Sequence, residues 1–243
     1  MRPFLIALQF LTQLPVQLTS YPEGHEVGRS LNYYPLIGLL IGALLAALAW
    51  VLNGVPALLG AALLLTAWVA LTGGLHLDGL ADSADAWVGG LGDRDRTLAI
   101  MKDPHCGPAA VVVIVLLLLI KFVALHASII AGTWEALLLA PILGRAVLPI
   151  LFLTTPYVRC QGLGTALANH QPRGSRLIIA ATVAALVVIS GITTIWLIMT
   201  TALVFFLMRR MMRRRIGGCT GDTAGALVEV TETAVLLTAV ILS

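Results

Sequence analysis

Long apolar runs with almost no charge constrain this chain more than any other feature. A helix needs about 20 mostly apolar residues to cross the hydrocarbon core of a bilayer, which is about 30 Å thick. Residues 33–52, 56–72, 108–131 and 135–156 meet this requirement, and residues 223–242 meet it after two acids near their start. Only 11% of the residues are charged, against about 25% in an ordinary soluble domain. The pattern predicts an all-α, polytopic membrane protein and excludes a soluble enzyme, a coiled coil and a disordered chain.

The remaining apolar run, residues 177–208, is too long for a single crossing. At about 1.5 Å per residue, one helix over this run would be about 48 Å long. A hairpin turning near Gly191 would instead make two short crossings. The hairpin places the Lys and Arg residues outside the apolar runs on one face, as the positive-inside rule requires. We therefore expect about seven transmembrane helices in a single domain, residues 1–243, with the large polar loops in the cytoplasm.

The N-terminal segment and the composition add further expectations. Gln9, Gln13 and Pro15 interrupt residues 3–19, which predicts an interfacial or re-entrant helix rather than a full crossing. No small-residue cleavage site follows this run, so a cleaved signal peptide is not expected. The formal charge of +3 is explained by the basic residues that set the orientation of a membrane protein, so we do not predict nucleic-acid binding. The three cysteines lack paired spacing and indicate neither disulfides nor a zinc site.

Three acids, Asp78, Asp82 and Asp85, follow one another at helical spacing where an apolar run ends. At about 100° per residue they fall within one arc of about 60° on a helix. Carboxylates stacked in this way repel each other, and no Lys or Arg is interleaved with them. A counter-cation would remove the repulsion, and ligation by oxygen alone favours Mg²⁺ or Mn²⁺ over zinc. The alternative is an exposed acidic helix end without a metal.

A second acidic segment opens the last apolar run. Asp222 follows a Gly-Gly pair at the same offset as Asp78 does, and Glu229 lies seven residues later on the same helical face. Acids inside a crossing are costly unless they face a polar cavity or a cation. We expect Asp222 and Glu229 to join the metal site, although Asp222 alone is also explained as a helix N-cap.

Several cations are placed to meet an anionic partner. Lys102 and Asp103 directly precede a crossing, in a loop that either contacts an anionic substrate or is simply solvated. Lys121 and Arg145 lie in the middle of two crossings, where a buried charge needs an anionic partner. That partner is either a substrate phosphate or an acid such as Glu229.

Carboxylates on two helices, a divalent ion and nearby cations together favour phosphoryl transfer, in which an acid deprotonates an attacking hydroxyl. The position at the cytoplasmic face suits an amphiphilic substrate activated as a nucleotide diphosphate. No Walker-type loop is present, so ATP-driven work is not expected. A phospholipid synthase of the CDP-alcohol type and a small-molecule transporter remain alternatives.

At these residues the chain resembles the cobalamin synthase family. The longest matching motif is Gly73-Gly74-Leu75-His76-Leu77-Asp78-Gly79-Leu80-Ala81-Asp82-Ser83-Ala84-Asp85-Ala86. Shorter matches are Tyr34-Pro35-Leu36-Ile37-Gly38, Ile100-Met101-Lys102-Asp103, Ala140-Pro141-Ile142-Leu143-Gly144-Arg145 and Gly217-Gly218-Cys219-Thr220-Gly221-Asp222-Thr223-Ala224-Gly225-Ala226. After Asp103 the chain has Pro104-His105-Cys106-Gly107 where the family has Ser-Arg-Ile-Gly, so His105 stands in place of a permanent cation.

The resemblance implies a multi-pass enzyme of the inner membrane with its active site on the cytoplasmic side. It implies Mg²⁺-dependent transfer from adenosylcobinamide-GDP to α-ribazole or its 5′-phosphate, with release of GMP, and it is compatible with a homo-oligomer. The expected metal ligands are Asp78, Asp82, Asp85, Asp222 and Glu229, of which Asp82 and Asp85 are also the expected catalytic residues. The expected substrate-binding residues are His76, Lys102, Asp103, Lys121 and Arg145.

Overall fold

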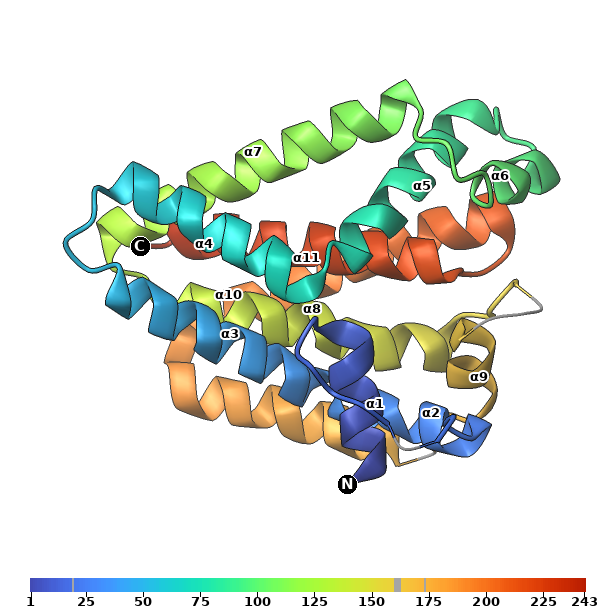
Figure 1. Ribbon diagram of the computed structural model, residues 1–243, viewed down its shortest axis with the longest axis horizontal. Coiled ribbons are helices and arrows are strands. Elements are labelled where there is room, and N and C mark those ends of the chain that lie inside the picture. The colour runs from blue at the N-terminus through green and yellow to red at the C-terminus, as the bar shows by residue number, and fades with distance from the viewer. Residues whose placement is uncertain (19, 160–162, 173) are drawn as a thin grey trace.

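All regular elements of the described part of the chain are helices (Figure 1). The computed structural model describes residues 1–18, 20–159, 163–172 and 174–243. The helices are α1 (Arg2–Leu11), α2 (Gly24–Ser30), η1 (Leu31–Tyr33), α3 (Tyr34–Val51), α4 (Ala57–Thr72), α5 (Leu75–Gly89), α6 (Arg94–Ile100), α7 (Pro108–Ala131), α8 (Glu135–Thr154), α9 (Leu163–Asn169), α10 (Ser175–Ile216) and α11 (Gly221–Ile241).

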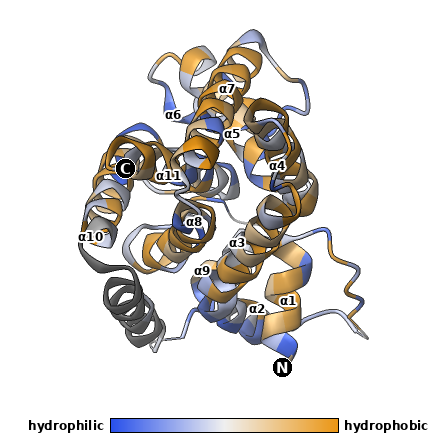
Figure 2. Cartoon of the chain, turned by 90° about the vertical axis from the view of Figure 1, so that its left-hand side faces the viewer, coloured by the Kyte–Doolittle hydropathy of each residue, from blue (hydrophilic) through white to orange (hydrophobic). Residues whose placement is uncertain are grey.

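Five helical segments of the described residues are long and apolar enough to cross a membrane. They are α2 to α3 taken together, α7, α8, the Thr194–Ile216 part of α10, and α11; α4 with α5 adds a sixth if this bent pair counts as one. Figure 2 shows hydrophobic residues over much of α3, α4 and α7. Val111, Val115 and Leu119 of α7 are exposed, as expected for a surface that faces lipid. The all-α, polytopic prediction is confirmed, and the count of seven was approximate.

The backbone of α10 is helical from Ser175 to Ile216. Its first part lies by the start of α3, and its last part lies by the end of α8. Thr182 lines a hollow together with Arg29 and Pro35. Arg209 donates from Nε to the Thr155 hydroxyl over 3.0 Å. A straight helix would separate positions 182 and 209 by about 40 Å. This placement agrees with two crossings, although the turn expected near Gly191 lies outside the residues that are described with their side chains.

Helix α8 lies between α3 and α11 and contacts both along its length (Figure 1). It runs antiparallel to α3, since Gly38 lies against Pro141 and Gly42 against Leu138. A Cβ at position 38 would be 2.4 Å from the Pro141 carbonyl oxygen. Glycine therefore lets the two backbones meet, which is how helices commonly pack inside membranes.

A sharp bend separates α4 from α5. Gly73 and Gly74 have φ angles of 62° and 67°, which side chains rarely adopt, and the two helix axes differ by 88°. Because α5 turns away from α4, it does not continue the crossing. Helix α5, which carries the three acids, thereby runs toward one end of the bundle and contacts α6 there (right in Figure 1).

The N-terminal helix α1 is short and packs against α2 and α3. It ends at Leu11, before Gln13 and Pro15, and buries Ile6 and Ala7. Its 10 residues are too few to cross a bilayer. This agrees with the expected interfacial or re-entrant helix.

The contact between α3 and α8 gives a prediction about stability. Replacing Gly38 by Ala should lower the melting temperature of the detergent-solubilised protein, because the added Cβ meets only rigid backbone of α8. Gly60→Ala in α4 is the control, since its nearest neighbour is the flexible tip of Ile129 at 3.4 Å. Both changes gain about 1 kcal/mol of helix propensity, so equal melting temperatures would contradict the packing role of Gly38.

Candidate functional site

The first turns of α5 and α11 are brought together by a glycine. A Cβ on Gly79 would lie 2.7 Å from the carbonyl oxygen and 2.9 Å from the Cα of Asp222. No larger residue allows this approach without moving a backbone. The contact places Asp78 and Asp82 of α5 beside Asp222 of α11, so the two acidic segments converge as predicted.

Asp82 lies partly buried between like charges. Burial raises the pKa of Asp82 to about 6, with the carboxylates of Asp222 and Asp78 adding to the rise and Arg159 opposing it. An acid with a raised pKa between other acids marks an excess of negative charge. A cation between α5 and α11 would relieve this excess.

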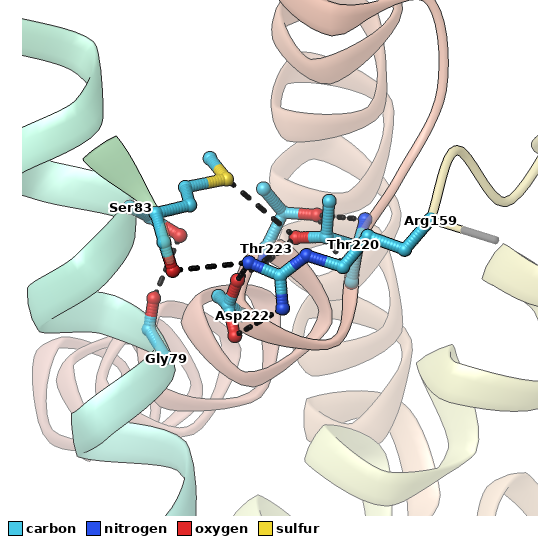
Figure 3. A network of polar contacts seen from close by, with 7 residues as sticks. Gly79, Ser83, Arg159, Thr220, Asp222 and Thr223 are labelled. Atoms are coloured by element: carbon cyan, nitrogen blue, oxygen red, sulfur yellow. Dashed lines mark hydrogen bonds and ion pairs between the residues drawn. The ribbon is translucent and has the colours of Figure 1, made fainter. Parts of the chain in front are cut away.

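Arg159 supplies the cation that the structure itself places there (Figure 3). Its Nη2 lies 2.6 Å from Oδ2 of Asp222 and donates to the carbonyl of Met101 over 3.0 Å. A short parallel bridge between Tyr157 and Cys219 holds the segment before Arg159 against the start of α11. Sequence reasoning missed this residue as part of the site. Its only signal in the sequence was a positive charge in a polar loop, 63 residues from Asp222.

Thr220, and not Asp222, is the N-cap of α11. Its hydroxyl accepts a hydrogen bond from the Thr223 backbone over 3.2 Å, and the Thr223 hydroxyl accepts one from the Thr220 backbone over 2.9 Å. The alternative that Asp222 serves as a helix cap is therefore wrong. Asp222 lies in the first turn of α11, and its side chain points to Arg159 instead of capping the helix.

Asp85 has a different set of partners from the other acids of α5. Its two carboxylate oxygens accept hydrogen bonds from the backbone of Gly107 over 2.6 Å and of Ala110 over 2.9 Å. A carboxylate in this position stabilises the N-terminus of α7. Its expected roles as metal ligand and general base stay predictions, and the geometry gives it the task of fixing α5 to α7.

The loop residues Lys102 and Asp103 are exposed. Asp103 accepts a hydrogen bond from the backbone of His105 over 3.0 Å and lies 2.5 Å from Nδ1 of its ring. These hydrogen bonds lower the pKa of Asp103. Neither Lys102 nor Asp103 lines the pocket described next, and their contact with substrate stays a prediction.

A pocket opens beside the acids, where α1, α3, α5, α8, α9 and α11 meet. Its lining residues are Phe10, Tyr34, Leu75, His76, Asp78, Gly79, Leu148, Phe152, Gly164, Leu167, Gly221, Asp222, Ala224 and Gly225. His76, an expected substrate-binding residue, is 4% exposed and lines this pocket together with two of the acids. The structure thus brings His76, Asp78 and Asp222 to one cavity.

Lys121 and Arg145 form a buried ion network instead of facing this pocket. Lys121 Nζ lies 3.0 Å from Oε2 of Glu229 and 2.5 Å from Oε2 of Glu232. Arg145 contacts the other oxygen of Glu232, and its side chain is 0% exposed. Of the two partners left open for these cations, the geometry favours acids over a substrate phosphate. Phosphate binding by Lys121 and Arg145, and metal binding by Glu229, stay predictions.

No group of three or more His, Cys, Asp or Glu side chains among the described residues is arranged to hold a metal ion. The donors themselves suit Mg²⁺ or Mn²⁺, since Asp78, Asp82 and Asp222 offer only oxygen. An ion between α5 and α11 would compete with Arg159 for Asp222.

The buried network predicts a large effect on stability. Lys121→Met should reduce the yield and melting temperature of the folded protein, because it leaves the carboxylate of Glu229 buried without its cation. Removing one member of a buried ion pair costs about 3–5 kcal/mol. The same change at exposed Lys102 is the control and should leave the melting temperature unaltered. Equal stability of the two variants would show that the network is not needed for folding.

Comparison with known proteins gives matches along nearly the whole chain. A family model described as cobalamin-5-phosphate synthase matches residues 3–240. A protein of Pseudomonas savastanoi pv. phaseolicola named adenosylcobinamide-GDP ribazoletransferase is 57% identical over 243 residues, covering 100% of both chains. Proteins of the same name from Pseudomonas fluorescens and Pseudomonas aeruginosa are 59% and 54% identical, covering 98% of this chain and 98% and 97% of theirs. No solved structure matches the chain. The chain therefore belongs to the cobalamin-5-phosphate synthase family.

Proposed function

We propose that the acids of α5 and α11 catalyse the transfer of the adenosylcobinamide-phosphate group from adenosylcobinamide-GDP to α-ribazole or its 5′-phosphate, with release of GMP. The family and the names of full-length relatives support this late step in assembly of the cobalamin nucleotide loop. They also weaken the alternatives of a CDP-alcohol-type synthase and a transporter. The observation that carries the catalytic assignment is the convergence of Asp78, Asp82 and Asp222 at one end of the bundle.

The reaction is Mg²⁺-dependent in this proposal. The donor set fits the ion, because the carboxylates offer oxygen alone and their like charges are incompletely neutralised. Asp78, Asp82 and Asp222 would hold it, and when bound it would offset negative charge on the diphosphate and on departing GMP.

Asp82 is the carboxylate best placed to take a proton. The hydroxyl oxygen of the ribazole attacks the phosphorus that carries the cobinamide arm, the bond from that phosphorus to the GMP oxygen breaks, and the hydroxyl proton passes to Asp82. A partly exposed carboxylate at this end of the bundle can serve as a general base. Arg159 has a buried Nε that finds no hydrogen-bond partner among the described residues, and its guanidinium could hold a phosphate oxygen.

The site lies on the cytoplasmic side of the inner membrane in this proposal. Exposed Arg210, Arg213 and Arg214 end α10 at the same end of the bundle as the acids. Clustered arginines next to a crossing favour the cytoplasmic face.

Asp82→Asn tests the proton acceptor. We expect GMP release from adenosylcobinamide-GDP and α-ribazole to fall at least 100-fold, since a general base contributes about 10²–10⁴. Yield and melting temperature should stay unchanged. Asp95→Asn on exposed α6 is the matched control and should keep full activity. Wild-type turnover in Asp82→Asn would remove this residue from the chemistry.

Mg²⁺ binding is testable without turnover. Mg²⁺ at about 100 times its Kd should stabilise the wild-type protein by about 2.7 kcal/mol, seen as a higher melting temperature. Asp222→Asn should lose this shift, whereas Asp95→Asn should retain it. An equal shift in all three proteins would place the ion elsewhere, and no shift in the wild type would argue against a resident ion.

A further inference from the structure

The pocket beside the acids is small and mostly apolar. Its volume of about 160 Å³ is below the roughly 300–1,000 Å³ of sites that enclose a whole drug-sized ligand. Leu148, Leu167 and Phe152 form part of its wall, and Phe10 stacks on Tyr34 with ring centroids 6.4 Å apart. Such a cavity accepts one flat apolar ring system and no more.

One buried nitrogen belongs to a residue that lines this pocket and lacks a partner. His76 is 4% exposed, and its Nδ1 has no hydrogen-bond partner among the described residues. A buried polar atom left unpaired costs about 1–3 kcal/mol, so such atoms are usually paired by protein, water or ligand. A neutral histidine ring carries one donor and one acceptor nitrogen, so the ring of His76 can donate one hydrogen bond.

The substrates of the proposed reaction present four flat ring systems: corrin, adenine, guanine and benzimidazole. The corrin ring is far larger than the pocket. Adenine and guanine each carry several donors and acceptors, and a lining that is mostly aliphatic, aromatic and glycine would leave most of them unpaired. The dimethylbenzimidazole of ribazole is flat and apolar apart from one free ring nitrogen, which matches a pocket with one unpaired nitrogen.

The position of the pocket also suits the nucleoside. Asp78 and Asp222 line the same cavity as His76. A base inserted toward His76 therefore leaves its ribose beside the acids, where the attacking hydroxyl is needed.

We propose that this pocket binds the benzimidazole base of ribazole, with His76 donating a hydrogen bond to the free ring nitrogen of the base. The assignment rests on the proposed function and adds which substrate enters the cavity and which residue selects it. The adenosylcobinamide-GDP substrate then approaches the acids from outside the cavity.

His76→Phe separates the two substrates. We expect the KM for α-ribazole to rise at least tenfold while the KM for adenosylcobinamide-GDP stays unchanged. Trp87→Phe is the control, because Trp87 lines a separate groove with Met208 and Met211, and it should alter neither KM. A rise confined to the KM for adenosylcobinamide-GDP would overturn the assignment.

A ligand analogue tests the hydrogen bond without relying on a variant. The indole counterpart of ribazole lacks the free ring nitrogen, so the wild-type protein should bind it at least tenfold more weakly than α-ribazole in equilibrium dialysis. His76→Phe should lose most of this discrimination. Equal binding of the two nucleosides by the wild type would overturn the role of His76.

The two proposals fail in different ways. If the wild type releases no GMP from the two substrates with Mg²⁺, the proposed function fails, and dialysis still decides whether the cavity takes the base. If the wild type turns over but the variant shifts neither the KM for α-ribazole nor its discrimination, the pocket assignment alone fails.

Discussion

The contact of Gly79 with the backbone of Asp222 is the constraint on which the rest of the site depends. It sets α5 against α11 at a distance that no side chain at position 79 permits. Without it, the acids of the two helices would face separate surroundings. With it, Asp82 lies among like charges that raise its pKa, and Asp222 meets Arg159. The missing Cβ of Gly79 thereby helps to join two acidic helix ends into one site.

Two clusters of charged side chains occur in this bundle, and they differ in whether their positive and negative charges cancel. In the buried network, Lys121 and Arg145 face Glu229 and Glu232, so two cations meet two carboxylates and the formal charges cancel. At the end of the bundle, Asp78, Asp82 and Asp222 outnumber Arg159, the cation that lies beside them in the described part of the chain. Balanced buried charges hold helices together, whereas unbalanced and partly exposed charges attract a ligand. Both clusters consist of acidic and basic side chains, so their net charge and exposure distinguish them more clearly than the types of residue do.

Much of this arrangement could be predicted from the sequence, because it follows from patterns along one helix. Apolar runs predicted the crossings, and the spacing of Asp78 and Asp82 predicted a shared face. Contacts between distant segments left no such pattern. Asp85 caps α7 through Gly107, which lies 22 residues away, and Arg159 reaches Asp222 across 63 residues. The cost of burying the charge of Lys121 predicted an anionic partner, either a substrate phosphate or an acidic side chain. Only the packing of α7 on α11 showed that the partners are acids.

The bend at Gly73 and Gly74 explains how one site serves two dissimilar substrates. A straight continuation of α4 would carry the acids along a crossing, surrounded by other helices or lipid. The 88° turn sets them instead at the end of the bundle, with Asp78 exposed while His76, two residues earlier, is buried. Helix α5 thus places His76 at the apolar pocket and Asp78 both at the pocket and at the solvent. A small base can enter the pocket while a bulky amphiphilic diphosphate reaches the acids from the solvent.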